Sequence, residues 1–230
     1  SNSNLRKLKA YSETIGIDLI KGNKKFREVR FSKYETDLKQ LSKEGQNPDI
    51  LFIGCSDSRV TPELVLDTRP GDMFTLRNVG NFVPPYNPDE DFHGTSAVIE
   101  YAVNVLEVKH IIVCGHSHCG ACKSLYQDLG DGPDLINVKK WLELGKKAKE
   151  YTLLATLDKN DKEQLYRTTE KVSIVYQMEN LLTFPYIVRR IKEGTLQIHG
   201  WYYKIENGSI EFYDGSDCTF KPLDEFKNEL

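Results

Sequence analysis

The chain of 230 residues carries 31 Lys and Arg against 34 Asp and Glu, a formal net charge of −3 at pH 7. Proteins that bind nucleic acid or anionic membranes usually carry a basic excess, so neither is an expected partner. With 39% hydrophobic and 28% charged residues, the chain can bury a substantial core, and disorder is not expected as its main state. No apolar run approaches the roughly 18 residues of a membrane-spanning helix, and no signal peptide is visible. We therefore expect a soluble, cytoplasmic protein, with an organellar matrix as the alternative if a transit peptide has been trimmed.

The sequence holds five cysteines, an odd number at low density. This argues against the disulfide framework of a small secreted domain. We expect reduced thiols, so at least one of them should have another task. The five are Cys55, Cys114, Cys119, Cys122 and Cys218.

Residues 1–45 are expected to form an N-terminal helical arm. From Leu5 to Leu41 the sequence is charged and free of proline, with apolar residues at loosely helical spacing, which predicts two helices. Such a segment could pack on its own domain or reach across to a partner chain, and composition alone does not separate these alternatives. Residues 46–230 form the second part, and we expect the two parts to function as a single domain.

Three short apolar runs predict buried parallel strands. They are Asp49–Cys55, Met73–Leu76 and His110–Cys114. Farther along, two aromatic, β-rich segments flank Asn207-Gly208, which is the strongest hairpin signal in the chain. These segments are Thr195–Tyr203 and Ser209–Tyr213.

Helices are predicted between the strands. Thr61-Pro62-Glu63 combines an N-cap residue, a first-turn proline and a first-turn acid, which indicates a short helix. The other expected helices are Thr95–Leu106, Gly120 to about Leu129, and a long region after Gly132-Pro133 to about Glu193, broken near Leu157–Asp161 and at Pro185. The alternation predicts an α/β fold with a mostly parallel central sheet of about four parallel strands plus an antiparallel edge strand, flanked by helices.

Two reactive segments follow two of the predicted strands. Cys55-Ser56-Asp57-Ser58-Arg59 ends the first, and Gly115-His116-Ser117-His118-Cys119-Gly120 ends the third. Ligands gather outside the carboxyl ends of strands in such sheets, and adjacent strands could bring the two segments within bonding distance. Two thiolates and an imidazole, from Cys55, His116 and Cys119, match the three-ligand pattern of a catalytic zinc site that keeps a fourth position open.

A structural zinc would need a fourth ligand, and the candidates are Cys122, His118 and Asp57. Free Cys is usually a small buried hydrophobe, so Cys122 is expected to pack in the core. His118 should face away if His116 binds the metal. Asp57 could bind zinc, accept a hydrogen bond from zinc-bound water or cap the turn. Arg59 could hold its carboxylate bidentately and keep it ionised, which is typical of a pair that orients a nucleophile.

The simpler interpretation is that Cys55 and Cys119 are ordinary buried thiols and His116 a satisfied turn histidine. Any one of the three alone would fit it, but their placement at the ends of neighbouring strands favours a metal. A thioredoxin-like redox site is the other alternative, because Cys119-Gly-Ala-Cys122 has CxxC spacing. Its placement relative to the first strand disfavours it.

In order and spacing, the motifs resemble those of the β-class carbonic anhydrases. The resemblance rests on Cys55–Arg59, Arg77-Asn78-Val79-Gly80-Asn81 and Gly115–Gly120. It extends through Val83–Tyr86, Ile99–Val103, Asn180–Leu182 and His199–Tyr203, and so covers most of residues 46–213. The N-terminal helices and residues 135–167 resemble the family only in the kind of structure expected there, and they contain no matching motif.

The resemblance implies a lyase with one Zn²⁺ per chain that reversibly hydrates CO₂ to bicarbonate and a proton by zinc-bound hydroxide. Cys55, His116 and Cys119 would be the zinc ligands, and Asp57 with Arg59 the catalytic pair. Arg59 would hold Asp57 off the metal. His118, His93 and Tyr101 are candidate proton relays.

The family divides into subgroups, and Phe52 stands where the subgroup with a regulatory bicarbonate pocket carries Trp. The plant-like subgroup lines its substrate pocket with Gln, Phe and Tyr at positions that match this chain, which implies an open, three-ligand site. For the two pocket residues Phe74 and Val79, plain core packing is the simpler interpretation. The substrate-binding residues that the resemblance implies are Gln46, Phe74, Val79, Tyr101 and Gly120.

The family also implies a homodimer, in which the N-terminal helices embrace the partner and both chains line the pocket, and pairing of dimers into tetramers. Two other hypotheses remain open. One is a non-catalytic, zinc-dependent CO₂ or bicarbonate sensor on the same fold, against which the Asp57–Arg59 pair argues. The other is an enzyme for a CO₂ isostere such as CS₂.

Overall fold

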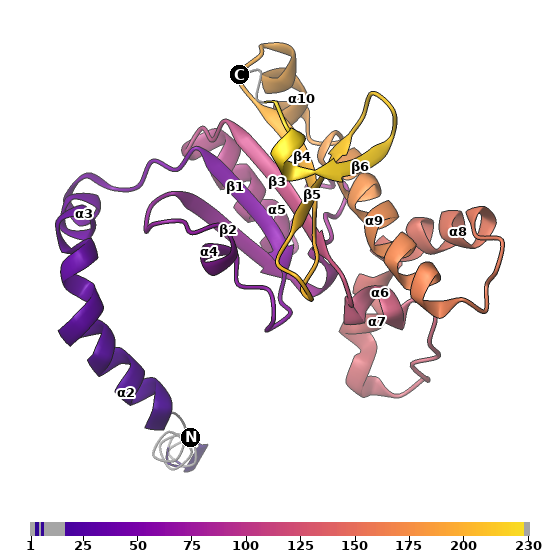
Figure 1. Ribbon diagram of the computed structural model, residues 1–230, viewed down its shortest axis with the longest axis horizontal. Coiled ribbons are helices and arrows are strands. Elements are labelled where there is room, and N and C mark those ends of the chain that lie inside the picture. The colour runs from indigo at the N-terminus through magenta and orange to yellow at the C-terminus, as the bar shows by residue number, and fades with distance from the viewer. Residues whose placement is uncertain (1–2, 5, 7–16, 228–230) are drawn as a thin grey trace. The chain divides into compact units, whose positions relative to one another are not determined.

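The computed structural model describes residues 3, 4, 6 and 17–227 (Figure 1). The chain divides into two compact units, Ser1–Gln46 and Asn47–Leu230, and each is described by itself. Within the described residues, no helix is both long enough and apolar enough to cross a membrane.

Residues 17–44 of the N-terminal unit form one continuous helical segment. It consists of α2 (Ile17–Lys25), a π-helical turn (Phe26–Arg30) and α3 (Phe31–Glu44). It ends at Gly45, whose φ of 83° is readily adopted only by glycine. Much of the predicted first helix, residues 7–16, lies outside the described residues, and the rest runs without a break because no proline interrupts it.

The N-terminal unit has no apolar core among its described residues. Neither α3 nor the π-helical turn contains a buried residue. Leu19, Ile20 and Val29 are 72%, 68% and 64% exposed. Exposed apolar side chains at helical spacing are typical of a helix that packs against something outside its own unit.

The second unit is built on a six-stranded sheet with the order β2-β1-β3-β4-β5-β6. The four parallel strands are β1 (Ile50–Cys55), β2 (Met73–Asn78), β3 (His110–His116) and β4 (Gln197–Tyr203). The two antiparallel strands are β5 (Ile210–Asp214) and β6 (Thr219–Pro222). The mostly parallel sheet is confirmed, and so is the hairpin between β4 and β5. A second antiparallel strand, β6, was not expected. It ends at Pro222, and a proline is tolerated there because β6 lies at the edge of the sheet, whereas it would break a central strand.

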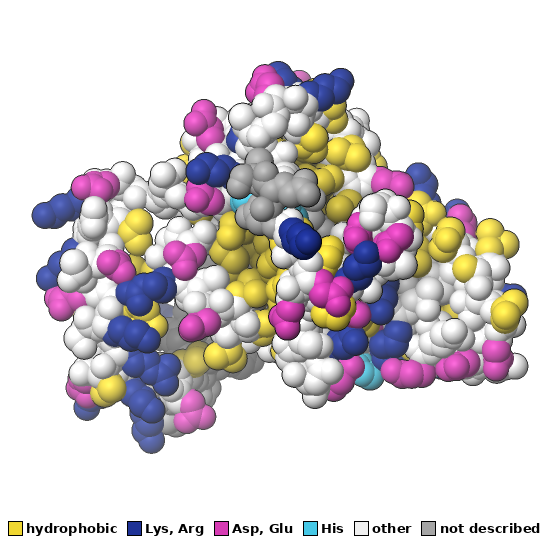
Figure 2. All heavy atoms as spheres, turned by 45° about the horizontal axis from the view of Figure 1, so that its top comes forward, with side chains coloured by type: hydrophobic (Ala, Val, Ile, Leu, Met, Phe, Trp, Pro, Cys, Tyr) yellow, Lys and Arg dark blue, Asp and Glu magenta, His cyan; other side chains and the backbone are white. Residues whose placement is uncertain are grey.

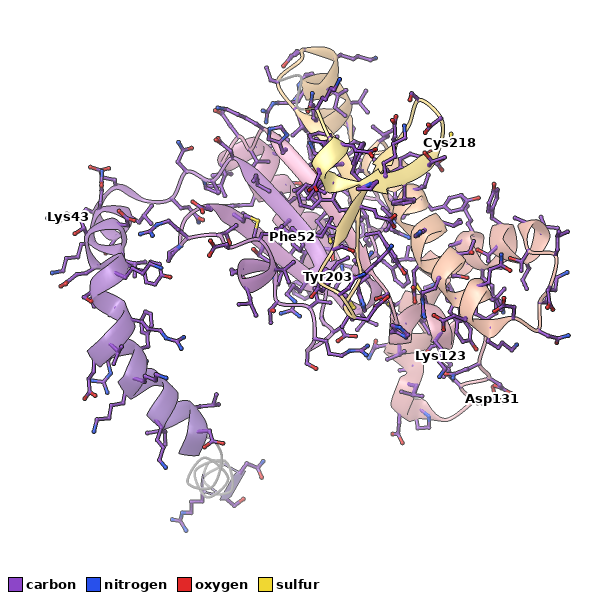
Figure 3. All side chains as sticks on the ribbon, in the orientation of Figure 1. Lys43, Phe52, Lys123, Asp131, Tyr203 and Cys218 are labelled. Carbon is purple, nitrogen blue, oxygen red and sulfur yellow. The ribbon has the colours of Figure 1, made fainter. Side chains whose placement is uncertain are left out.

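The sheet buries side chains on both faces, as parallel strands do. On one face, Leu51 and Ile53 of β1 and Val113 of β3 pack with the helices α5, α9 and α10. On the other face, a smaller cluster contains Phe52 and Tyr203 (labelled in Figure 3) together with residues of and around α4.

The helices lie between and after the strands. Those of the main core are α5 (Gly94–Glu100), which continues as a π-helical turn (Tyr101–Val105), α9 (Lys162–Leu181) and α10 (Pro185–Lys192). The others are α4 (Pro62–Val65), α6 (Gly120–Ser124), α7 (Ile136–Leu142) and α8 (Lys146–Ala155). Short 3₁₀ turns cover Val79–Asn81, Pro133–Leu135, Glu143–Gly145 and Leu223–Glu225.

Most predicted helix boundaries agree with the structure. The long helical region breaks between α8 and α9, over residues 156–161, and again before Pro185, as predicted. The helix after Gly120 is shorter than expected. The sequence predicts an end near Leu129, whereas α6 ends at Ser124. The segment that follows, up to Gly130 with its φ of 73°, turns instead of continuing the helix.

Candidate metal centre

Three metal-ligating side chains meet at the carboxyl edge of the sheet. Cys55 is the last residue of β1, His116 is the last residue of the adjacent β3, and Cys119 precedes α6 in the turn after β3. Their ligand atoms all lie within 4.8 Å of one another. The three residues are 6%, 1% and 2% exposed. The juxtaposition predicted from the sequence is therefore present.

The histidine is arranged as a metal ligand would be. Its Nδ1 lies 2.7 Å from the carbonyl oxygen of Ser117, so an Nδ1–H group can donate there and leave the lone pair of Nε2 free. His116 Nε2 is buried and has no hydrogen-bond partner among the described residues. An unpartnered buried nitrogen beside two thiols is costly unless a cation binds it. The set of donors thus fits Zn²⁺.

The protonation of the two thiols also depends on a bound cation. The hydrogen bond with Cys119 and burial together raise the pKa of Cys55 to about 12. The hydrogen bond with Cys122, together with burial, also raises the pKa of Cys119. Without a cation nearby, both thiols therefore stay protonated at neutral pH. A divalent metal reverses this preference, because it stabilises thiolates directly. The backbone N–H of Gly80 also donates to Cys55 Sγ, at 3.4 Å.

Asp57 and Arg59 form a closed pair beside the ligands. Arg59 donates from Nε to Asp57 Oδ1 at 3.0 Å and from an Nη atom to Oδ2 at 2.8 Å, and its backbone N–H reaches Oδ1 at 2.9 Å. These bonds from Arg59 lower the pKa of Asp57 to about 2. Asp57 Oδ2 lies 3.9 Å from His116 Nε2. A carboxylate that only accepts hydrogen bonds is thereby fixed next to the metal position.

Arg77 holds the backbone of this segment. It donates from Nε to the carbonyl of Cys55 at 2.8 Å and from an Nη atom to the carbonyl of Asp57 at 2.6 Å. Arg77 lies in the motif Arg77–Asn81, which by itself indicates no role for it. Its position on β2, in register with Gly54 of β1, is what could have suggested one.

The turn after β3 is held from three elements. Ser117 Oγ donates to Glu206 at 2.6 Å, and the Cys119 N–H donates to Glu170 at 3.0 Å. Arg59 donates to the carbonyl of His118 at 2.8 Å. The importance of Glu170 was missed, because a Glu three residues after an Arg on a helix normally signals only a surface ion pair.

The five substrate-binding residues predicted from the resemblance do not form one cluster within the second unit. Phe74 and Tyr101 stack, with ring centroids 5.6 Å apart. Val79, 44% exposed, lines a cavity of about 1040 Å³ whose described lining does not include that aromatic pair. Gly120 begins α6 directly after Cys119, and Gln46 is an exposed residue at the end of the N-terminal unit.

The remaining cysteines do not join the ligand cluster. Cys122 is 3% exposed and packs with Phe82 and Leu142, as expected for a core thiol. Cys114 is buried on the opposite face of the sheet, and Cys218 is exposed in the loop between β5 and β6 (Figure 3). All five cysteines are free thiols.

The face of the molecule in Figure 2 carries basic and acidic side chains interspersed. This agrees with the near balance of charges in the sequence.

Comparisons with known proteins point to one family. The model of the family described as carbonic anhydrase matches residues 50–210. A carbonic anhydrase of Synechocystis sp. is 44% identical over 86% of this chain and 70% of its own length. One from Helicobacter pylori is 33% identical over 91% of this chain and 95% of its own.

Solved structures agree. The β-carbonic anhydrase CcaA has a TM-score of 0.83 at 40% identity, covering 93% of this chain and 92% of that chain. A tetrameric β-carbonic anhydrase from Sordaria macrospora has a TM-score of 0.66 at 32% identity, covering 92% and 97%. The fold and the buried Cys-His-Cys cluster are those of a β-class lyase. This chain belongs to the β-carbonic anhydrase family.

Proposed function

We propose that the protein is a zinc-dependent carbonic anhydrase that hydrates CO₂ reversibly to bicarbonate and a proton. One Zn²⁺ per chain would be held by Cys55, His116 and Cys119. The observation that carries the proposal is the convergence of these three buried ligand atoms within 4.8 Å. A closed Asp57–Arg59 pair next to them supports a catalytic role over a structural one.

Zinc in such a site is a Lewis acid that makes water a nucleophile near neutral pH, for which carbonic anhydrases are the standard example. Asp57 contributes orientation. Because Arg59 keeps its carboxylate ionised, Asp57 can only accept a hydrogen bond, and so it fixes the direction of an O–H group beside His116. Arg59 occupies both carboxylate oxygens, which keeps Asp57 from turning toward the ligands. This supports the open, three-ligand site of the plant-like subgroup.

Carbon dioxide is uncharged, so its pocket should be small and largely apolar. The resemblance assigns that pocket to Val79, Phe74 and Tyr101, with Gln46 and the backbone N–H of Gly120 steadying a bicarbonate oxygen. The Val79 cavity and the Phe74–Tyr101 stack are separate within the second unit. A pocket made from two chains would account for that separation.

A homodimer or homotetramer follows from the same reasoning. The described N-terminal helices expose Leu19, Ile20 and Val29 and have no core of their own. One relative is titled as tetrameric. We propose that the arm of one chain packs on a second copy. Relatives include chloroplastic and mitochondrial proteins of Arabidopsis thaliana, and a cytoplasmic location remains our proposal for this chain.

The test is metal content together with stopped-flow CO₂ hydration. The wild-type protein should hold one zinc per chain and be active, and Cys55→Ser should lose both properties. Cys218→Ser is the matched control, because Cys218 is an exposed thiol outside the cluster. An active Cys55→Ser protein without metal would refute the proposal. A zinc-loaded wild type without turnover would favour the sensor.

A further inference from the structure

Glu170 is a buried carboxylate that no step of the proposed chemistry uses. It lies on α9 and is 2% exposed. Its Oε1 accepts from the Tyr202 hydroxyl at 2.7 Å and from Arg167 Nε at 2.8 Å. Its Oε2 accepts from Arg167 Nη2 at 2.8 Å and from the backbone N–H of Cys119 at 3.0 Å. Each oxygen therefore accepts two hydrogen bonds, which is what makes a buried charge tolerable.

Close packing of α9 on β3 brings this carboxylate to the ligand turn. A Cβ on Gly115 would lie 2.7 Å from Ile174 Cδ1, so only glycine lets the helix approach this closely. Ile174 and Glu170 are four residues apart on α9 and share one helix face. The same face thus meets β3 at Gly115 and the turn at Cys119.

Arg167 extends the contact to the neighbouring residue of the turn. One Nη atom of Arg167 lies 3.2 Å from His118 Nδ1 and 2.7 Å from Glu163. The carbonyl of His118 in turn accepts from Arg59, which holds Asp57. The Arg167–Glu170 pair is therefore connected to one metal ligand directly and to the catalytic pair through one residue.

We propose that Glu170 is a positioning residue of the metal centre. By accepting the N–H of Cys119 while Arg167 and Tyr202 fix its own carboxylate, it sets the turn so that the Cys119 thiol points at Cys55 and His116. The inference rests on the proposed function, since it assumes that this cluster binds zinc. Glu170 touches neither substrate nor metal, and it acts through Cys119.

A merely structural brace would stabilise the fold without changing the metal site, and the experiment separates the two roles. Zinc affinity is measured by competition with a chromophoric chelator for the wild type, Glu170→Gln and Glu163→Gln. Glu163→Gln is the matched control, because it removes another carboxylate partner of Arg167 from the same helix, and that carboxylate is 71% exposed and does not contact the turn. Cobalt-loaded samples report on the ligand set through the thiolate-to-metal charge-transfer band.

We expect Glu170→Gln to weaken zinc binding by about 10- to 100-fold, the usual effect of losing a group that orients a ligand, and to alter the cobalt band. Glu163→Gln should match the wild type in both measurements. Equal zinc affinity and an unchanged band in folded Glu170→Gln would overturn the proposal. So would equal losses in the two variants.

A second measurement uses the metal-free protein and therefore does not depend on zinc chemistry. In the wild type, the Cys119 amide should exchange slowly with solvent and resonate downfield, as an N–H bonded to a carboxylate does. If Glu170→Gln fails to fold, Tyr202→Phe decides, because it removes one donor to Glu170 without touching the turn. Faster Cys119 exchange and weaker zinc binding in that variant support the proposal, and unchanged values overturn it. A wild type that binds no zinc would refute the proposed function and, with it, the metal-positioning role of Glu170; a protected Cys119 amide would then show only that Glu170 holds the turn.

Discussion

The two segments that supply the metal ligands are held in different ways. After β1, Asp57 pairs with Arg59, and their side chains are 14% and 51% exposed. After β3, Ser117 and Cys119 are 0% and 2% exposed, and Glu170, which accepts a hydrogen bond from Cys119, is 2% exposed. An ion pair with one half-exposed member contributes less free energy than a fully buried pair and exchanges more readily with water, whereas breaking a buried pair leaves an uncompensated charge. The first segment is therefore the adaptable side of the site, and the second is its rigid side.

His118 connects the two sides. Its φ of 58° lies in the left-handed region, which is uncommon for a residue other than glycine. In this conformation its carbonyl accepts a hydrogen bond from Arg59. A shift of the turn after β3 would therefore move the His118 carbonyl away from Arg59. This would in turn change how Arg59 orients the Asp57 carboxylate.

The largest expected effect comes from the adaptable side. Asp57→Asn removes the carboxylate that orients the reacting O–H group, and the new amide would place donors against the donors of Arg59. We expect CO₂ hydration to slow by about two to three orders of magnitude, the usual cost of removing one preorganised hydrogen-bonding group beside the reacting atoms. Because the three ligands are untouched, zinc content should stay at the wild-type level. Stopped-flow kinetics and metal analysis of one preparation check both.

Asp49→Asn provides the control for this experiment. Asp49 precedes β1, at the end opposite Asp57, and its exposed carboxylate lies 3.6 Å from Lys109. Removing its charge should leave the hydration rate unchanged. A wild-type rate in Asp57→Asn, or an equal loss in Asp49→Asn, would contradict the role given to Asp57.

A second prediction concerns acid and the opposite edge of the sheet. His110 Nδ1 and His199 Nε2 lie 2.9 Å apart on neighbouring strands. Burial, followed by the proximity of His110, lowers the pKa of His199 from 6.5 to about 4. Burial also lowers the pKa of His110, an effect that Lys109 reinforces and Asp49 opposes. Both histidines are therefore neutral in the folded protein at pH 7.

Because the unfolded chain binds the proton first, the stability due to this pair is fully present above pH 6.5 and is lost as pH falls toward 4. The Asp57 carboxylate behaves differently, since its lowered pKa adds stability that is lost only as pH falls below 3.8 toward about 2. Acidification to pH 4 should thus destabilise the part of the sheet around His110 and His199, while the Asp57–Arg59 pair stays intact. Urea unfolding between pH 7 and pH 4 should show a loss of up to about 3 kcal/mol from His199. A His199→Gln protein with the same pH slope as the wild type would contradict this assignment.

The spacing of apolar residues and the positions of turn residues were sufficient to predict β1 to β5 and most helices. The runs that became β1 and β3 are apolar on both faces, and a buried parallel strand requires that pattern. The reactive segments followed from the same logic, since carboxyl ends of adjacent parallel strands share one edge. Cys55, His116 and Cys119 could therefore be grouped without a structure.

What could not be predicted depends on distant contacts. Glu170 and Cys119 are 51 residues apart in sequence, and nothing local to either indicates that α9 approaches β3 so closely at Gly115. Arg77 likewise acts on backbone carbonyls, which have no sequence signature. The short α6 reflects a turn that competes with helical propensity. Local patterns specify elements, but the partners of a buried polar group emerge only when the elements pack.

The smallest predicted effect compares the rigid segment after β3 with the adaptable segment after β1 most directly, because the same substitution, Ser to Ala, is made in each. Ser117→Ala removes a hydroxyl that donates to Glu206 at 2.6 Å and accepts from the Ile205 N–H at 2.9 Å. Because Ser117 is 0% exposed, water cannot replace these bonds easily, and we expect a loss of about 1–2 kcal/mol in the free energy of unfolding. Ser56→Ala, in the adaptable segment, changes an exposed side chain and leaves intact the bond from its backbone N–H to the Asn78 carbonyl. Its effect should stay within about 0.5 kcal/mol. Denaturant unfolding of both metal-free variants measures the difference, and equal losses would mean that the two segments are held alike.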